Sequence, residues 1–186
     1  MAITKQRLTL EEFLALPEEK PALEYEDGEV TQKVAPKGQH SVLQWRIAEL
    51  INDATRPGKV ALALPELRST YARTSRVPDI SVYTWERIPT DARGRIADDF
   101  FEPPDIAIEI VSPGQSVNRL VRRCLSFVAH GVRAALLVDP RDESVLLFVP
   151  GAAPVPLGRD DVIDLTSVVA GLEIRVDDVF AALELR

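Results

Sequence analysis

The sequence predicts an α/β (α+β) protein in which a mixed β-sheet core is flanked by helices and extended by an N-terminal hairpin. Apolar strand-like runs alternate with helical segments, an order typical of a sheet with helices packed outside it. Turn signals such as Asp27-Gly28 stand between neighbouring strands. The 186 residues suit one domain, spanning 1–186, and are enough to bury a core.

The first third of the chain opens with a short helix and a hairpin. Thr9 and Glu12 have the spacing of a capping box, which predicts a helix through Leu16 that Pro17 ends. Two strands then run over 23–30 and are joined at Asp27-Gly28. A helix and a pair of strands are expected over 41–54, 59–72 and 76–83.

The remaining segments complete the sheet. Residues 84–103 are polar and predict a surface loop. An apolar strand with Glu109 follows, and then a helix over 116–130 that Gly131 ends. Two hydrophobic strands, over 132–139 and 144–149, flank a hairpin turn, and a final helix is expected over 177–183.

Composition excludes several classes of function. The net charge of −7 argues against a generally basic nucleic-acid coat and directs attention to local patches. The single cysteine, Cys124, excludes an internal disulfide and a cysteine-based zinc site. No apolar run approaches the roughly 18 residues of a membrane span, so we expect no membrane partner and a cytoplasmic location.

Two carboxylates stand in apolar strands. Strand alternation puts Asp79 on the face opposite Ile80 and Val82. Glu109 lies in a strand in which the residues of both faces look buried. Burying a carboxylate without a partner costs several kcal/mol. Such a residue is therefore expected to have a cation or a metal beside it.

The helix after Glu109 separates charge from core. At about 100° per residue, one side is apolar and the other is basic. This stripe predicts a polyanion or a cluster of carboxylates beside it, with a solvated face as the alternative. The basic arc contains Arg119, Arg122, Arg123, Ser126 and His130.

These motifs resemble the restriction-endonuclease-like family of the PD-(D/E)XK nuclease superfamily. The resemblance is carried by Val77-Pro78-Asp79, by residues 108–113, by Gly131-Val132 and by residues 137–140. It implies a mixed sheet of about four strands flanked by helices. It also implies hydrolysis of DNA phosphodiester bonds with Mg²⁺, for which Mn²⁺ can substitute.

The resemblance also implies site residues. Asp79 and Glu109, with the carbonyl of Ile110, would hold the metal ion, and Glu24 matches an additional acid beside it. Each has a structural alternative: a strand-edge turn residue for Asp79, a buried ion pair with an arginine for Glu109, and an exposed strand carboxylate for Glu24.

The chain departs from the family at the lysine of the catalytic motif. Val111 stands where the superfamily lysine is expected, and the helix position that takes over this role in the family is Arg123. Arginine can clamp a phosphate but cannot take a proton from water. The sequence therefore predicts either a metal-dependent endonuclease, weakened in activity, or a nuclease-fold protein that binds nucleic acid or a protein partner without cutting.

Other residues are weaker candidates. Arg119, Arg122 and His40 are expected as phosphate contacts, with a cap or surface histidine as the alternative for His40. Ser112 is interpreted as the end of a strand, because no histidine with an acidic partner is spaced to activate it. A homodimer is also considered, because strands 134–138 and 145–149 include a candidate sheet edge.

Overall fold

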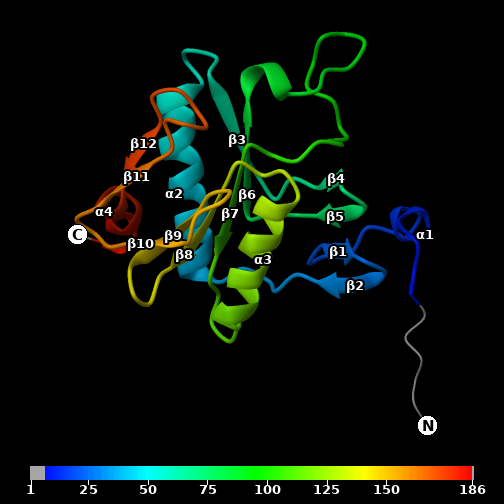
Figure 1. Ribbon diagram of the computed structural model, residues 1–186, viewed down its shortest axis with the longest axis horizontal. Helices are drawn as coiled ribbons and strands as arrows, with labels where there is room; N and C mark the ends of the chain where they lie inside the picture. The colour runs from blue at the N-terminus through cyan, green and yellow to red at the C-terminus, as the bar shows by residue number, and fades with distance from the viewer. Residues whose placement is uncertain (1–6, 186) are drawn as a thin grey trace.

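The fold is organised around a six-stranded sheet with the strand order β10-β9-β8-β7-β6-β3 (Figure 1). The computed structural model describes residues 7–185. All neighbouring strands are antiparallel except β7 and β8, which are parallel. The strands are β3 (Ala61–Pro65), β6 (Ile80–Thr84), β7 (Ile106–Ile110), β8 (Ala134–Asp139), β9 (Ser144–Phe148) and β10 (Val155–Leu157).

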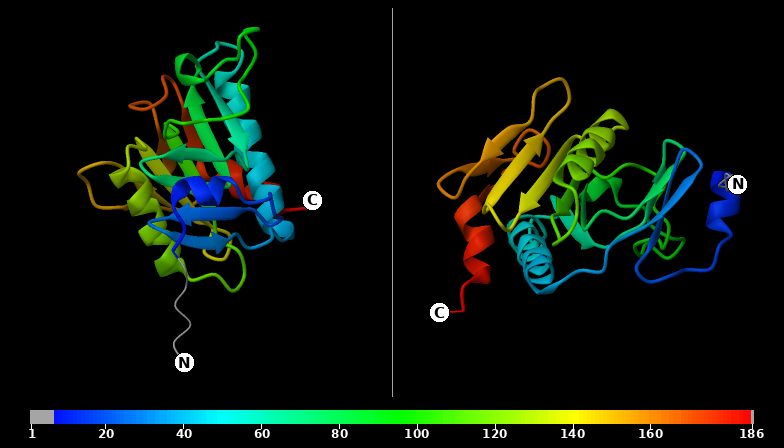
Figure 2. Two further views of the ribbon diagram at one scale, coloured as in Figure 1. Left: turned by 90° about the vertical axis from the view of Figure 1, so that its right-hand side faces the viewer. Right: turned by 90° about the horizontal axis from the view of Figure 1, so that it is seen from below.

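Two long helices cover opposite faces of this sheet (Figure 2). Helix α2 (Gly38–Thr55) packs on the face that contains Ile106 and Ile108. Helix α3 (Val117–Ala129) is the crossover that parallel strands require, and it packs on the face that contains Ala107 and Val111. Strand alternation puts Glu109 on the α3 face, so α3 is the helix that can contact this carboxylate.

A smaller sheet with the order β2-β1-β5-β4 lies beside the central one. Its hairpin turns at Asp27-Gly28, where both residues have positive φ, as the sequence predicts. Strand β5 continues through Val77 to Asp79 into β6, so the two sheets are joined next to Asp79. The strands are β1 (Leu23–Glu26), β2 (Glu29–Gln32), β4 (Ser69–Tyr71) and β5 (Thr74–Arg76).

The short elements complete the chain. Helix α1 (Leu10–Leu14) has Thr9 as its N-cap and the predicted capping box, in which the Glu12 carboxylate accepts a hydrogen bond from the Thr9 amide. The loop after β6 is irregular apart from a short 3₁₀ turn. The C-terminal segment consists of β11 (Val162–Asp164), β12 (Glu173–Arg175), α4 (Val176–Phe180) and a 3₁₀ turn (Ala181–Leu183). The mixed α/β fold with flanking helices is confirmed.

Two predicted strands are wrong in detail. The segment 59–72 contains β3 and β4, which belong to different sheets. The chain leaves β3 at Pro65 and Glu66, where proline lacks an amide hydrogen and Glu66 adopts a φ of +52°. The segment 76–83 is likewise divided between β5 and β6 by Pro78.

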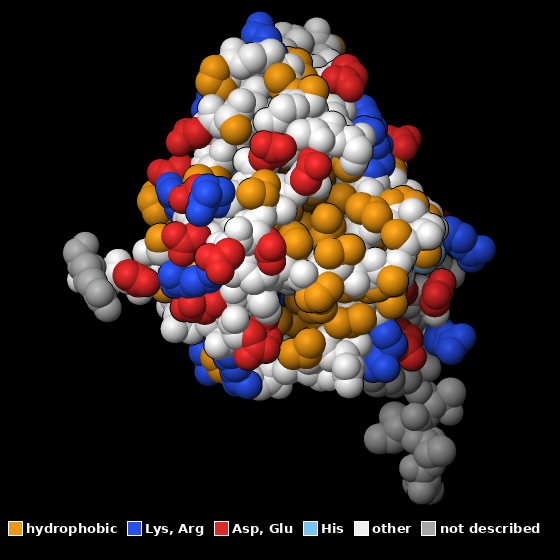
Figure 3. All heavy atoms as spheres, turned by 60° about the vertical axis from the view of Figure 1, so that its left-hand side comes forward, with side chains coloured by type: hydrophobic (Ala, Val, Ile, Leu, Met, Phe, Trp, Pro, Cys, Tyr) orange, Lys and Arg blue, Asp and Glu red, His pale blue; other side chains and the backbone are white. Residues whose placement is uncertain are grey.

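The expected sheet edge is also wrong. Strands β8 and β9 are internal, because β10 pairs with the outer side of β9. Hydrophobic side chains gather on the side of the molecule that holds β10 and β11 (Figure 3), where Val155 and Val162 are exposed. A homodimer stays a prediction. Within residues 7–185, no helix is both long and apolar enough to cross a membrane.

Candidate metal and phosphate site

Asp79, directly before strand β6, and Glu109, on strand β7, lie side by side. Ile80 pairs with Ile108 in an antiparallel register, so continuing the register by one residue puts Asp79 opposite Glu109. Opposite residues of antiparallel strands project from the same face. Both side chains are buried, with Asp79 3% and Glu109 4% exposed. The sequence interpretation of two carboxylates in buried strands is thus confirmed by their positions.

Asp79 is held by groups from three segments. Its Oδ2 accepts a hydrogen bond of 2.7 Å from the Ile110 amide, and its Oδ1 lies 2.8 Å from Lys33 Nζ. The Nε2 atom of His40 lies 3.5 Å from the same Oδ1. Burial raises the pKa of Asp79, but His40 and Lys33 outweigh it and hold that pKa at about 2. Asp79 is therefore a carboxylate at every physiological pH.

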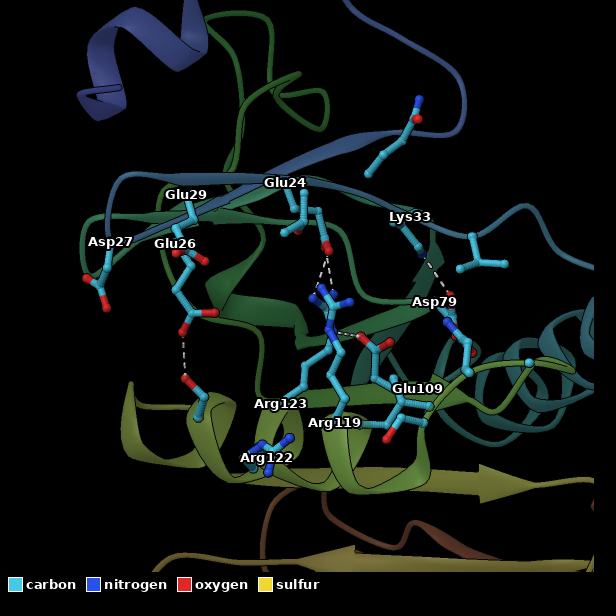
Figure 4. Close-up of a pocket in the computed structure, with 18 of the residues that line it drawn as sticks. Glu24, Glu26, Asp27, Glu29, Lys33, Asp79, Glu109, Arg119, Arg122 and Arg123 are labelled. Carbon is cyan, nitrogen blue, oxygen red and sulfur yellow. Dashed lines mark hydrogen bonds and ion pairs between the residues drawn. The ribbon is translucent and has the colours of Figure 1, made fainter. Parts of the chain in front are cut away.

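Glu109 meets the basic helix at Arg123. The Arg123 Nε donates a hydrogen bond of 2.7 Å to Glu109 Oε1 (Figure 4). Burial raises the pKa of Glu109 to about 7; Arg123 acts against this rise, and the neighbouring Asp79 charge adds to it. The buried ion pair considered as the alternative for Glu109 is present. The prediction that a carboxylate cluster lies beside the basic stripe is confirmed as well.

Glu24 completes this cluster from strand β1. Both of its carboxylate oxygens accept hydrogen bonds from Arg123, at 2.6 and 2.7 Å, and Oε1 also accepts one of 2.6 Å from the Val77 amide. Burial raises the pKa of Glu24, but Arg123 and the Val77 amide bring it below its ordinary value. The exposed-carboxylate alternative is wrong, because Glu24 is only 6% exposed.

Lys33 is a site residue that the sequence interpretation missed. It follows β2 and extends its ammonium between Asp79 Oδ1, at 2.8 Å, and both oxygens of Glu66, at 3.1 Å. Burial lowers the pKa of Lys33, but Asp79, Glu109 and Glu66 outweigh it and raise that pKa above its ordinary range. No spacing signal connects Lys33 to Asp79, because helix α2 and strands β3, β4 and β5 separate them in sequence.

His40 and Ser112 are closer than the sequence suggested. Ser112 Oγ lies 2.9 Å from His40 Nδ1, and the other ring nitrogen faces Asp79. The statement that no histidine with an acidic partner stands near Ser112 is wrong. Ser112 is nevertheless 2% exposed and packed at the strand end, so a substrate cannot reach its hydroxyl. His40 is buried too, which excludes the surface alternative.

An open cavity of about 780 Å³ lies between the hairpin and α3, and its lining includes Glu24, Lys33, His40, Asp79, Glu109 and Arg123. Arg119 and Arg122 project from α3 into its rim and are exposed, whereas Arg123 points inward to the carboxylates (Figure 4). The hairpin adds acidic side chains at the other rim, namely Glu26, Asp27 and Glu29. The cavity thus has a buried acidic floor and rims of mixed charge.

The donor atoms fit a divalent cation. Asp79 and Glu109 supply carboxylate oxygens, which Mg²⁺ and Mn²⁺ prefer. Among the described residues, ligand atoms of His40, Glu66 and Asp79 lie within 4.8 Å of one another. The buried Nε2 atom of His40 has no hydrogen-bond partner among residues 7–185. Asp79 belongs to both sets, which makes it the central candidate ligand.

A mixed sheet whose central strands carry paired buried acids at the floor of an open cavity has the arrangement that the nuclease resemblance predicts. Comparison with known protein families supports the same conclusion. The family model of Uma2, described as "Putative restriction endonuclease", matches residues 10–177. The chain therefore belongs to the Uma2 family. Its assignment to a nuclease family, made from the motifs, is confirmed.

A solved structure gives the same result. The crystal structure of a protein described as "a putative nuclease belonging to DUF820", from Anabaena variabilis ATCC 29413, matches with a TM-score of 0.90 and 38% identity. The match covers 95% of this chain and 99% of that one. The cryoEM structure of the DrdV–DNA complex is only weakly similar, with a TM-score of 0.33 and 11% identity over 78% of this chain and 13% of that one. No curated protein matches the sequence.

Proposed function

We propose that the protein is a metal-dependent endonuclease that hydrolyses phosphodiester bonds of DNA. The observation that carries the proposal is the pair of buried carboxylates, Asp79 and Glu109, on adjacent strands at the floor of an open cavity. Two acids buried side by side repel each other and each costs several kcal/mol to bury, which favours a site that holds a cation between them.

We infer that Asp79, Glu109 and the Ile110 carbonyl hold Mg²⁺ or Mn²⁺, with His40 and Glu66 offering further ligand atoms. When bound, the ion supplies charge neutralisation and lowers the pKa of water. Hydrolysis adds water to phosphorus and breaks one P–O bond, and the leaving oxygen gains a proton.

In this proposal the arginines of helix α3 have two different roles. Arg123 uses three hydrogen bonds to orient Glu24 and Glu109, which keeps both acids in place. Arg119 and Arg122 are exposed at the rim, where they can bind the phosphates of a DNA backbone. Because the overall charge is −7, binding depends on this local patch. The cytoplasm stays the predicted location.

The test is a plasmid-nicking assay with Mg²⁺, Mn²⁺, Ca²⁺ and a chelator. We expect the wild type to nick supercoiled plasmid with Mg²⁺ or Mn²⁺, and Asp79→Asn and Glu109→Gln to lose at least about a hundredfold in rate. Asp142→Asn, at the exposed β8–β9 turn, is the matched control. Absence of wild-type nicking with every ion contradicts the proposal.

A second candidate is a nuclease-fold protein that binds nucleic acid or a protein partner without cutting. One observation favours it: Arg123 and Lys33 already compensate the carboxylates, so the site is stabilised without a metal ion. This candidate predicts DNA binding in a mobility-shift assay, weakened by Arg119→Met, without nicking under any divalent ion.

A further inference from the structure

Val111, directly after β7, stands where the nuclease resemblance expects a lysine, whereas Lys33, directly after β2, brings a lysine to the same site. Lys33 approaches the site from the hairpin side, opposite α3, and lines the same cavity as Asp79 and Glu109 (Figure 4). Its ammonium lies 2.8 Å from Asp79 Oδ1, and its side chain is 11% exposed. A positive charge thus lies directly beside the predicted metal ligand.

Arg123 is poorly suited to contact a substrate, because every nitrogen of its guanidinium already donates to Glu24 or Glu109. Its guanidinium makes three short hydrogen bonds to Glu24 and Glu109 and stacks over the Phe127 ring at 5.0 Å. Turning Arg123 toward a phosphate would leave two buried carboxylates unpaired, which is costly. Arg123 is therefore held as a positioning residue.

Lys33 is held less tightly than Arg123. Apart from Asp79, its partner is Glu66, whose side chain is 44% exposed and can exchange the ammonium for water at little cost. A lysine ammonium has three donors on a flexible stem, so it can keep Asp79 and also turn one donor toward the cavity. Of the two cations that contact the acidic floor, Lys33 is the one with freedom to move.

We propose that Lys33 is a catalytic residue whose ammonium donates a hydrogen bond to a non-bridging oxygen of the scissile phosphate, in place of the lysine missing at Val111. The inference rests on the proposed nuclease function. Lys33 acts by charge and hydrogen bonding, because charge accumulates on these oxygens as water attacks phosphorus. The ammonium also occupies Asp79 Oδ1, so Lys33 competes with a divalent ion for this ligand atom.

The two roles predict opposite effects of one substitution. Lys33→Met removes the donor, and we expect single-turnover nicking by saturated enzyme to fall by about a hundredfold or more. It also removes the competing charge, and we expect the Kd for Mn²⁺, measured by calorimetry without DNA, to fall by about tenfold. Lys33→Arg keeps the charge and should retain a Kd near that of the wild type.

The matched control is Lys59→Met, at the exposed turn between α2 and β3, which should leave both readouts unchanged. Nicking by Lys33→Met within about threefold of a nicking wild type overturns the inference and leaves the nuclease function standing. Weaker Mn²⁺ binding by a folded Lys33→Met variant also overturns it, because Lys33 would then only place Asp79. A wild type that does not nick with any ion overturns the proposed function itself.

Discussion

Replacing Arg123 with methionine tests whether this arginine is the clamp of the acidic cluster. Arg123 is the shared partner of Glu24 and Glu109, whose side chains are 8% and 6% exposed. Methionine keeps much of the apolar stem over Phe127 but removes the charge and all three hydrogen bonds. The substitution therefore isolates the ion pairs from the packing of α3.

The expected loss of stability is large. Removing one partner of a buried ion pair costs about 3–5 kcal/mol, because the remaining charge stays desolvated. For a chain of this length about 2–4 °C in Tm corresponds to each kcal/mol, so Tm should fall by about 6–20 °C. Arg122→Met, one residue away on the exposed face, should change stability by less than about 0.5 kcal/mol.

The pH dependence of this loss of stability gives a sharper test of the role of Arg123. Arg123 holds the pKa of Glu24 below its ordinary value, so in the wild type this carboxylate stabilises the fold above pH 4.5 and loses that contribution as the pH falls. Without Arg123 the same carboxylate is destabilising when ionised. The difference in unfolding free energy between the two proteins should thus be largest at pH 8 and shrink toward pH 4. Urea unfolding at several pH values measures it, and a loss that is small or independent of pH would refute the clamp.

Three further predictions concern charge. Burial raises the pKa of Glu109 to about 7, so its ionised fraction falls as the pH drops below 7. The affinity for Mn²⁺ should therefore decrease roughly fivefold from pH 7 to pH 6. Equal affinity at the two pH values would contradict this prediction. Asp105→Asn, which weakens the pairs of a fully buried carboxylate with arginines, should lower the unfolding free energy by about 2–4 kcal/mol yet leave Mn²⁺ affinity unchanged in calorimetry. Arg119→Met and Arg122→Met should each lower the salt dependence of DNA binding by about one counterion, and an unchanged slope would remove them from the interface.

The sequence predicts most of the fold because its signals are local. The capping box at Thr9, the Asp27-Gly28 turn and the apolar face of α3 each depend on residues within a few positions of one another. Division of segment 59–72 between two sheets was missed, because a strand propensity does not identify the partner strand. The same limit explains the wrong sheet edge, since β10 is short and carries a proline.

The residues of the candidate site likewise fall into those that the sequence reveals and those that it does not. Asp79 and Glu109 could be found because a carboxylate in an apolar strand is conspicuous, and Arg123 because it stands in a basic stripe. Lys33 and the contact of His40 with Ser112 could not be found, because they depend on how the hairpin and α2 pack against β6 and β7.

Calorimetric titration of the wild type with Mn²⁺ tests the central claim most directly. The account predicts saturable binding at neutral pH that is lost in Asp79→Ala and weakened in Glu109→Gln, with both variants still folded by circular dichroism. Wild-type protein that binds neither Mn²⁺ nor Mg²⁺ would contradict the assignment of the two carboxylates as metal ligands.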